Sequence, residues 1–347
     1  MKIGLIAPPW LPVPPGQYGG TESVIDRVAR GLVRAGHEVL LAAPDGSSCP
    51  VPQVAGLGTA DPDRIGQVVI EIPYALAAYE ALRGVDIVHD HTVAGPLCAR
   101  VPDGVPLVTT NHGPFDENLG PIYAEMSRRG VAVVAISAHQ ASTAPDVRIA
   151  AVIHHGIDVA DVPMGDGGGG YACFLGRMVP DKGVREAVLA ARAAEMPLRI
   201  AAKMREPEEE QYFEEVVQPL LGGNIEYIGE LDHEDKYELL GNAVALLNPL
   251  QWPEPFGLVM IEALACGTPV VASSDGSVPE IVTDGVTGFI REDTPSVAEA
   301  LRQVTTLSRA ACREAAETSL RTSRMVADHV KLYEQLLLTS EGANTSR

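Results

Sequence analysis

The sequence predicts an α/β protein of two domains, each with a parallel sheet covered by helices. The chain has 347 residues, which exceeds the size of a typical single core. Short apolar runs alternate with amphipathic segments, the pattern of parallel strands joined by helices. This series restarts after a glycine-rich stretch at residues 164–170. We therefore predict domains at residues 1–160 and 171–322, joined by a flexible linker at 161–170.

Ile3–Ala7 is the first expected strand, and a Pro/Gly loop follows it. From Thr21 the apolar residues recur at helical spacing until Gly36, which is typical of a helix C-terminus. Continuous apolar runs of the kind found in buried parallel strands then follow at Val39–Ala43, Val85–His89, Pro106–Thr110, Val131–Ile136 and Ala150–Ile153.

The second series has strands at Tyr171–Leu175, Leu198–Ala202, Ile225–Ile228, Val244–Asn248 and Pro269–Ala272. Helices are expected at Val184–Glu195, at Gly257–Cys266 and, last, at Val326–Leu338. The glycine run could also be a surface loop inside one domain, but the restarting pattern favours a hinge.

Composition narrows the class of protein. Hydrophobic residues make up 46% and charged residues 21%, as in ordinary globular proteins. The net charge of −20 argues against general affinity for nucleic acid or anionic lipid. No apolar run approaches the roughly 18 residues of a membrane span, so stable membrane insertion is not expected. Five scattered cysteines without a Cys-x-x-Cys pair fit a reducing cytoplasm. The first apolar run stops at Pro8, so we interpret it as a strand and not a secretion signal.

The segment from Trp252 to Val271 is the most informative. A predicted strand ends at Asn248, Glu254 lies in the loop after it, and Glu262 lies within the helix that Gly257 opens. A helix N-terminus offers free N–H groups and a positive dipole end to hydroxyl or phosphate oxygens. Two carboxylates can accept hydrogen bonds from hydroxyls at two points of a ligand.

A second group of polar residues follows the first strand of the second series, which ends near Gly176. Arg177 and Lys182 come next, in the turn before a helix. Because open α/β sheets bind ligands at the carboxyl ends of their strands, these cations could bind a diphosphate. They would place positive charge locally in a chain that is acidic overall.

Two further patterns lie in the first half. Gly19 and Gly20 join the first strand to its helix, where backbone can approach an anion closely. No complete G-x-G-x-x-G follows this strand, which disfavours a dinucleotide-dependent oxidoreductase. His112 directly follows the strand that ends at Thr110 and is a candidate catalytic residue.

Other polar motifs point less clearly to a function. His89-Asp90-His91 could suggest a metal site, but no distant third ligand is identified, so a structural or ligand-lining role is favoured. Asp61-Pro62-Asp63 spells the Asp-x-Asp of metal-dependent sugar transferases, yet it lies in a loop and follows no clear buried strand. No metal ligands are therefore predicted.

The segment at Glu254–Val271 resembles the E-P-F-G-L-x-x-x-E-A signature of the family 4 retaining glycosyltransferases, and Gly176–Gly183 resembles their G-R-x-x-x-x-K-G motif. The resemblance spans nearly the whole chain, with its specific motifs between Gly176 and Glu280. It implies that Glu254 contacts the transferred sugar and that Glu262 binds the ribose. The amides of the three residues that open the helix, Phe256, Gly257 and Leu258, would lie near the sugar.

The same resemblance implies that Arg177 and Lys182 bind the donor phosphates, that Gly19 and Gly20 approach the donor or the acceptor, and that His112 lies beside the reacting sugar. His155 stands where the family usually has Asn, which leaves its role open. Glu280 lies in a stretch similar to the family's G-G-x-P-E and is expected to be structural.

The resemblance also implies the GT-B architecture, two facing Rossmann-like domains with an interdomain cleft. A C-terminal helix, about residues 323–347, would cross back to the first domain. The implied activity is metal-independent transfer from a UDP- or GDP-sugar to a small-molecule or lipid acceptor, with retention by a front-face mechanism and no cofactor. A sugar phosphorylase, a nucleotide-sugar epimerase or a non-catalytic nucleotide-sugar-binding protein on the same fold stay open as alternatives, as do the donor base, the acceptor and the oligomeric state.

Overall fold

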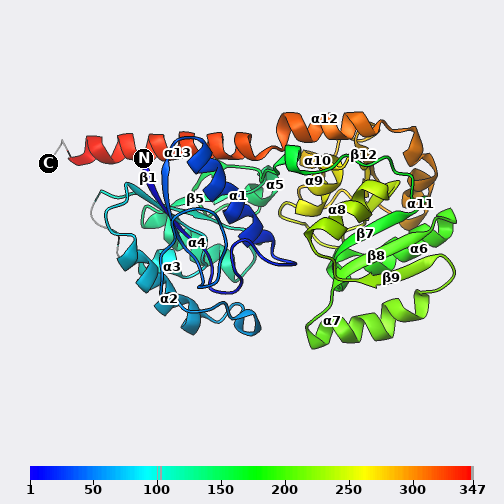
Figure 1. Ribbon diagram of the computed structural model, residues 1–347, viewed down its shortest axis with the longest axis horizontal. Coiled ribbons are helices and arrows are strands. Elements are labelled where there is room, and N and C mark those ends of the chain that lie inside the picture. Colours follow the sequence, from blue (N-terminus) through cyan, green and yellow to red (C-terminus); the bar gives the residue numbers. More distant parts are fainter. Residues whose placement is uncertain (100, 102–103, 345–347) are drawn as a thin grey trace. The chain divides into compact units, whose positions relative to one another are not determined.

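A computed structural model describes residues 1–99, 101 and 104–344 of the chain (Figure 1). The chain forms two compact units. The first domain contains residues 1–156 together with the C-terminal segment from Thr322, and the second contains Ile157–Arg321.

The first domain is built on a six-stranded parallel sheet with the order β2-β1-β3-β4-β5-β6. Its strands are β1 (Lys2–Ile6), β2 (Glu38–Ala42), β3 (Ile87–Asp90), β4 (Leu107–Thr110), β5 (Ala132–Ala135) and β6 (Ile149–Val152). Strands β1 and β3 pair without a register shift, and Ile6 lies beside Asp90. The strand order reverses between these two strands, which makes their carboxyl ends the switch point of this sheet.

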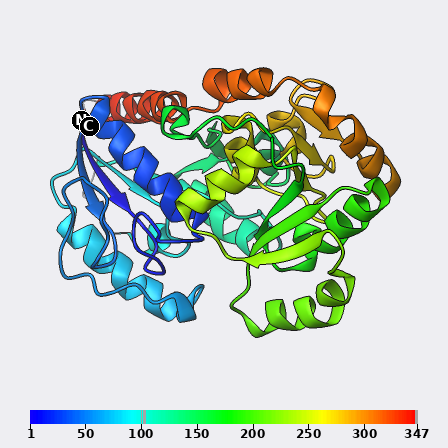
Figure 2. The same cartoon turned by 45° about the vertical axis from the view of Figure 1, so that its right-hand side comes forward.

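Helices connect these strands. They are α1 (Gly20–Arg34), α2 (Val68–Ala81), α3 (Gly95–Cys98), α4 (Leu119–Arg128), α5 (Ala138–Ser142) and α13 (Thr322–Asn344), with a 3-10 turn at Pro62–Arg64. The long C-terminal helix α13 (red) lies along α1 (blue), as Figures 1 and 2 show. A Cβ on Gly31 of α1 would lie 2.4 Å from the Val326 side chain, so glycine allows this close approach. The prediction that the last helix returns to the first domain is confirmed.

The second domain repeats the plan with the sheet order β12-β11-β10-β7-β8-β9. Its strands, all parallel, are β7 (Ala172–Arg177), β8 (Leu198–Lys203), β9 (Ile225–Gly229), β10 (Ala245–Asn248), β11 (Val270–Ala272) and β12 (Gly288–Ile290). Here the order reverses between β7 and β10, which are hydrogen-bonded neighbours near the middle of the sheet.

Seven α-helices belong to this part of the described chain: α6 (Val184–Ala194), α7 (Pro207–Tyr212), α8 (His233–Asn242), α9 (Leu258–Ala265), α10 (Val278–Ile281), α11 (Thr294–Gln303) and α12 (Arg309–Ser319). The 3-10 turns are Val159–Asp161, Pro180–Lys182, Gln218–Leu220 and Val304–Thr306, and a π-helical turn spans Phe213–Val217. Among the described residues, no helix is both long enough and apolar enough to cross a bilayer.

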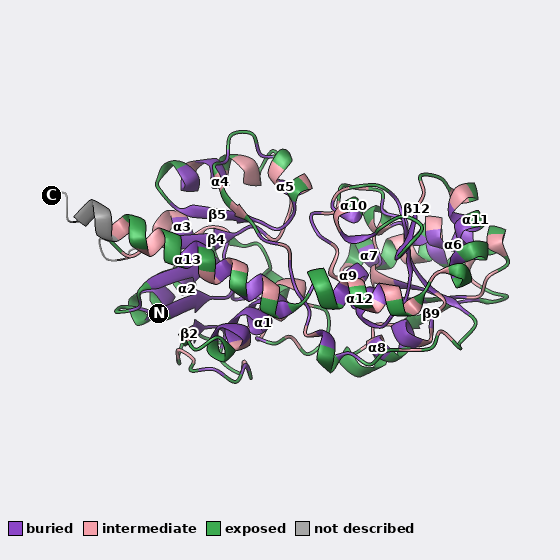
Figure 3. Cartoon of the chain, turned by 90° about the horizontal axis from the view of Figure 1, so that it is seen from above, coloured by how far each residue is buried: buried purple, intermediate pink, exposed green. Residues whose placement is uncertain are grey.

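Each sheet forms the centre of a separate hydrophobic core. In Figure 3 the strands are largely purple, or buried, whereas many helices carry buried and exposed faces. One core cluster gathers around Val88 and Val133 of the first domain, and another around Phe174 and Leu247 of the second. This burial on both faces explains why the strands read as continuous apolar runs in the sequence.

The predicted flexible linker at 161–170 differs from the structure, in which the segment is part of the second domain. Gly165 N donates to Cys266 O at 3.0 Å, and Gly167 N donates to Gly241 O at 3.0 Å. Arg309 Nε donates to Gly165 O at 3.0 Å. The glycines allow close packing here, since a Cβ on Gly165 would meet the Gly241 carbonyl at 2.0 Å.

The other expected elements lie within two residues of the observed ones at most of their ends. The last helix, α13, extends into polar turns on both sides of the apolar stretch Val326–Leu338. It agrees with the expected helix at about 323–347 as far as Asn344, and residues 345–347 of that prediction lie outside the described residues. The strand β12 was missed. It has only three residues and is bounded by Asp284-Gly285 and by the Asp293 cap of α11, so it carries no periodic signal.

Candidate active site

The residues predicted to bind a phosphorylated ligand lie at the switch point of the second sheet. Arg177 is the last residue of β7 and Gly176 the one before it, while Lys182 closes the 3-10 turn that follows. Glu254 lies in the loop after β10, the strand that neighbours β7 on the other side of the reversal. Loops at such a point diverge and leave room for a ligand, which makes this edge the expected binding position in an open parallel sheet.

The loops after β7 and β10 are fastened to each other through the backbone. Gln251 N donates to Asp181 O at 2.8 Å. Gly183 has φ of 74°, and a Cβ there would lie 1.9 Å from the Pro249 carbonyl oxygen. Only glycine fits both the left-handed conformation and this contact. The loop that carries Lys182 is thereby held against the loop that carries Glu254.

Lys182 and Glu254 form an ion pair in this structure, with the Lys182 ammonium on the Glu254 carboxylate. The Trp252 indole also donates to Glu254, with Nε1 3.0 Å from Oε2. The Lys182 Nζ lies 4.8 Å from the centroid of the Trp252 ring. The side chains of the ion pair are only 19% and 13% exposed, so solvent screens this pair less than it screens a surface pair.

The loop ends at the N-terminus of α9. Gly257 precedes the helix with φ of 87°, and no side chain caps the first turn. Ser277 supports this loop with two hydrogen bonds. Its N donates to Glu254 O at 3.0 Å, and its Oγ donates to Phe256 O at 2.5 Å. The first turn of α9 therefore has no N-cap side chain, and its amides lie just beyond Glu254 along the chain.

Glu262 occupies the second turn of α9 and is buried. Its Oε1 accepts a 2.8 Å hydrogen bond from the Lys236 ammonium on α8, whose side chain is 19% exposed. Sequence reasoning missed Lys236. No motif marks it, and it meets Glu262 only because α8 packs against α9.

Arg177 is paired differently. Its Nε donates to Glu209 Oε1 at 3.0 Å, and its Nη2 lies 3.7 Å from Glu206 Oε2. Burial raises the pKa of the Glu209 carboxyl, but hydrogen bonds with Glu206, with two backbone amides and with Arg177 lower it overall. Glu206 and Glu209 also form the capping box of α7. The structure thus gives Arg177 and Lys182 separate acidic partners.

In the first domain, Gly19 and Gly20 lie at the start of α1, after β1 at the switch point of that sheet. A Cβ on Gly19 would lie 2.7 Å from the Pro15 side chain, so the turn requires glycine. Glu22 is buried in the first turn of α1, and this burial raises the pKa of its carboxyl to about 7.

His112 follows β4, and its Nε2 lies 2.9 Å from Nδ1 of His91. The His155 ring stacks on the His112 ring, with centroids 5.2 Å apart and an interplanar angle of 19°. Burial lowers the pKa of His112 to about 4, so the ring is neutral at pH 7. The histidine neighbours of His112 were not predicted, although the alternation of His89 and His91 was noted.

Two sequence motifs, Asp61-Pro62-Asp63 and His89-Asp90-His91, contain residue types that bind metal ions. Asp61-Pro62-Asp63 lies at a 3-10 turn, where Pro62 and Asp63 are exposed. Within residues 1–99, 101 and 104–344, no three or more His, Cys, Asp or Glu side chains are arranged to hold a metal ion.

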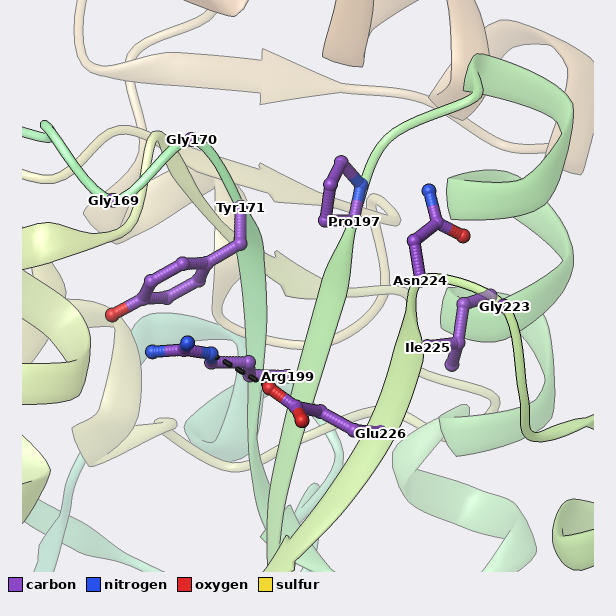
Figure 4. Close-up of a pocket in the computed structure, with 9 residues that line it drawn as sticks. All are labelled: Gly169, Gly170, Tyr171, Pro197, Arg199, Gly223, Asn224, Ile225 and Glu226. Carbon is purple, nitrogen blue, oxygen red and sulfur yellow. Dashed lines mark hydrogen bonds and ion pairs between the residues drawn. The ribbon is translucent and has the colours of Figure 1, made fainter.

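A hollow of about 230 Å³ lies at the opposite end of the second sheet, where β7, β8 and β9 begin. In Figure 4 the Arg199 guanidinium lies beside the Tyr171 ring, 4.2 Å from its centroid, and pairs with Glu226 at 2.8 Å. The charges of Arg199 and Glu226 neutralise each other, and the hollow is remote from the carboxyl ends of the strands. We therefore place the candidate active site at the β7–β10 end.

Two family models match most of the chain. Residues 18–161 match the model described as Glycosyltransferase Family 4, and residues 166–319 match Glycosyl transferases group 1. Among curated relatives, the phosphatidyl-myo-inositol mannosyltransferase of Mycolicibacterium smegmatis is 28% identical over 83% of this chain and 80% of its own length. The glycogen synthase of Mycobacterium tuberculosis is also 28% identical, over 63% of this chain and 60% of that protein.

Solved structures show the same fold. A glycosyltransferase involved in avilamycin A biosynthesis superposes with a TM-score of 0.72 and 27% identity, covering 97% of this chain and 98% of that one. HepE of Anabaena, solved in complex with UDP and glucose, has a TM-score of 0.74 and 17% identity, covering 96% of this chain and all of that one. The second likeness is one of fold. Both agree with two Rossmann-like domains of the GT-B type.

Proposed function

This chain belongs to the family 4 glycosyltransferases, and on that premise we propose that it transfers a sugar from a nucleoside-diphosphate sugar to an acceptor hydroxyl, with retention of the anomeric configuration. The donor is assigned to the second domain and the acceptor to the first. HepE was solved with UDP and glucose, which supports a nucleotide-sugar donor for this fold.

The observation that carries the proposal is the Lys182–Glu254 ion pair at the β7–β10 switch point. A phosphate group competes for the Lys182 ammonium, because charge-assisted bonds to phosphate are strong and the site is partly desolvated. Once Lys182 binds the phosphate, the Glu254 carboxylate is free to accept from a sugar hydroxyl while Trp252 still orients it. The ion pair therefore brings the proposed phosphate-binding cation and the proposed sugar-binding carboxylate together at one point.

Glu262 is proposed to accept from the ribose hydroxyls, and the first amides of α9 to contact the sugar or its phosphate. Arg177 supplies a second cation within the same strand-end region. Its guanidinium is held by Glu209, which is 1% exposed, and this fixes one edge of the planar group.

In the proposed reaction, the bond between the anomeric carbon and the phosphate oxygen breaks as the acceptor oxygen bonds to that carbon from the same face. The acceptor proton passes to a phosphate oxygen, and the nucleoside diphosphate leaves. Lys182 and Arg177 stabilise the negative charge that builds on the diphosphate, which is the electrostatic task a preorganised site performs best. This chemistry assigns no role to a metal ion, and His112 keeps its predicted role as a substrate-contacting catalytic residue.

The acceptor is proposed to be a hydroxyl on a small metabolite or a lipid headgroup. One relative is named for a phosphatidylinositol acceptor, and one structural neighbour acts in the biosynthesis of avilamycin A. The reaction is assigned to the cytoplasm, where the five free cysteines would stay reduced.

Thermal unfolding with a panel of UDP, GDP, ADP and the matching sugar nucleotides, with and without EDTA, tests the donor assignment. A ligand that binds only the folded chain raises the melting temperature by mass action. We expect one nucleotide series to stabilise the protein whether or not EDTA is present, and Lys182→Ala to remove most of that shift. A folded protein that responds to none of these compounds would contradict the donor site.

A further inference from the structure

Five histidines gather in the first domain, and four of them are buried. They come from the end of β3, from the loops after β3, β4 and β6, and from α13: His89, His91, His112, His155 and His329. His112, which the proposed function places against substrate, is the partly exposed member. Each ring can exist in two neutral tautomers, so the hydrogen bonds of the group decide which nitrogen of His112 carries a proton.

His89 has both ring nitrogens occupied. Its Nδ1 lies 2.7 Å from Tyr333 Oη on α13, and its Nε2 lies 2.8 Å from Thr110 Oγ1. Two hydroxyls can adapt to either tautomer because each can donate or accept. His89 packs against His91, with ring centroids 4.1 Å apart, and so helps to fix its position.

His91 differs from His89, because only one of its nitrogens is hydrogen-bonded. Its Nδ1 is 2.9 Å from His112 Nε2, whereas its own Nε2 is buried and has no hydrogen-bond partner among the described residues. A single proton lies between the two rings, so one histidine donates and the other accepts. Burial lowers the pKa of both imidazoles, which makes a charged pair unfavourable at pH 7.

The buried Nε2 of His91 distinguishes the two neutral arrangements. If His112 donated, neutral His91 would carry its proton on Nε2, as a buried N–H without an acceptor. If His91 donates through Nδ1–H, its Nε2 is only an unused acceptor. Orphaned buried N–H groups are rarer in proteins than under-used acceptors, so the second arrangement is favoured.

We propose that His91 is a positioning residue, which holds His112 in the tautomer with a bare Nε2 and a protonated Nδ1. His112 then presents an N–H donor to a substrate oxygen, and it is not set up to act as a general base. The His155 ring stacks on the His112 ring and so restricts rotation of the His112 imidazole about its side-chain bonds. The functional half of this inference rests on the proposed glycosyltransferase activity, whereas the tautomer itself does not.

The full-length chain labelled with ¹⁵N allows the tautomer to be read directly from imidazole ¹⁵N shifts at pH 7.5, without substrate. His91→Asn keeps an N–H donor near the position of Nδ1, whereas His91→Leu removes it at similar volume. We expect the Nδ1–H form of His112 in the wild type and in His91→Asn, and a mixture or the Nε2–H form in His91→Leu. An Nε2–H His112 in the wild type, or an unchanged tautomer in His91→Leu, overturns the proposal.

Steady-state kinetics provide the functional readout. His91→Leu should lower kcat about tenfold with little change in donor KM, since roughly one oriented hydrogen bond is lost, and His91→Asn should restore most of it. His329→Phe is the matched control, because His329 belongs to the same cluster and its ring centroid lies 5.2 Å from that of His89. If His329→Phe lowers kcat as much as His91→Leu, the effect is one of packing and the positioning role is wrong. If the wild type shows no transfer with any donor, the proposed function fails while the tautomer result still stands.

Discussion

At the scale of single residues, three cations of the second domain are each paired with a carboxylate. Lys182 pairs with Glu254, Lys236 with Glu262 and Arg177 with Glu209. Such pairs limit the desolvation cost of charges in a partly buried site. They also mean that a ligand gains only the difference between its own contacts and those it replaces. Replacing the cation of a pair should therefore affect ligand binding differently from replacing its carboxylate.

Lys182→Ala should lower kcat/KM about a hundredfold, because a preorganised contact to developing charge is worth roughly 3 kcal/mol. The donor-hydrolysis or transfer rate checks this. Arg185→Ala is the matched control, since Arg185 follows closely in the chain but is half-exposed and pairs with Glu186. Near-normal turnover in Lys182→Ala would remove the phosphate assignment.

Lys236→Met should weaken nucleotide binding about tenfold and reduce the preference for ribonucleotides over their 2′-deoxy forms. The reason is that the 2.8 Å contact to Glu262 orients the carboxylate assigned to the ribose. Calorimetric titration of the single variants Lys236→Met and Glu262→Gln and of the double variant measures the coupling. Fully additive effects would show that Lys236 does not act through Glu262.

At the scale of elements, one arginine side chain holds three segments of the second domain together by hydrogen bonds. Arg309, at the start of α12, donates to the carbonyls of Gly165, Gly241 and Ala243 at 2.9–3.0 Å. It also donates to Cys266 O at 3.2 Å and to Thr268 Oγ1 at 2.8 Å. These acceptors come from the glycine-rich segment, the end of α8 and the turn after α9. One side chain thus fixes three segments that the sequence keeps far apart.

Arg309→Ala should lower the free energy of unfolding of the second domain by about 3 kcal/mol, because Gly165 O and Ala243 O lose the guanidinium donor and Gly241 O and Cys266 O each lose one of two donors. Chemical denaturation followed by hydrogen exchange of the 161–170 segment measures the loss. Arg302→Ala serves as the control, with a half-exposed side chain paired to Glu299. Unchanged protection of the glycine-rich segment would show that Arg309 does not hold it, and a segment unprotected already in the wild type would restore the flexible-linker interpretation.

At the scale of the whole molecule, the burial of neutral histidines makes the stability of the first domain depend on pH. Burial lowers the pKa of all five clustered histidines, to about 4 for His112 and about 3 for His329. Below about pH 6.5 the unfolded chain binds protons that the folded chain excludes, so stability falls as pH falls. Three acids act in the opposite direction, since burial raises the pKa of Asp90 and of Glu22 to about 7 and also raises the pKa of Glu71.

Because five imidazoles outweigh these carboxyls, the first domain should lose roughly 3 kcal/mol of stability per pH unit between pH 6 and 5. Denaturant titrations at pH 7.5, 6.5 and 5.5, read by hydrogen exchange of the β3 and β4 peptides, check the slope. His329→Phe should reduce it by about one proton, or ~1.4 kcal/mol per unit. Constant stability over this range would mean that the carboxyls balance the histidines.

The sequence by itself determined the two α/β series, eleven of the twelve strands in the described part of the chain, and the two motifs around Lys182 and Glu254. These follow from local chemistry: burial on both sheet faces makes strands continuously apolar, and glycine marks turns that no other residue fits. A motif confined to twenty residues carries its own spacing, so Glu254 and Glu262 were identified without any tertiary contact.

Only the tertiary structure decided the partners. Lys182 and Glu254 are 72 residues apart in the chain. They meet because the strands that precede them, β7 and β10, are neighbours in the sheet. Lys236, Glu209 and the histidines around His112 reach their contacts through the packing of helices and strand ends, which leaves no periodic trace in the sequence. Long-range pairing of this kind depends on sheet order and side-chain geometry, and a glycine run reads as flexible until Arg309 is seen to hold it.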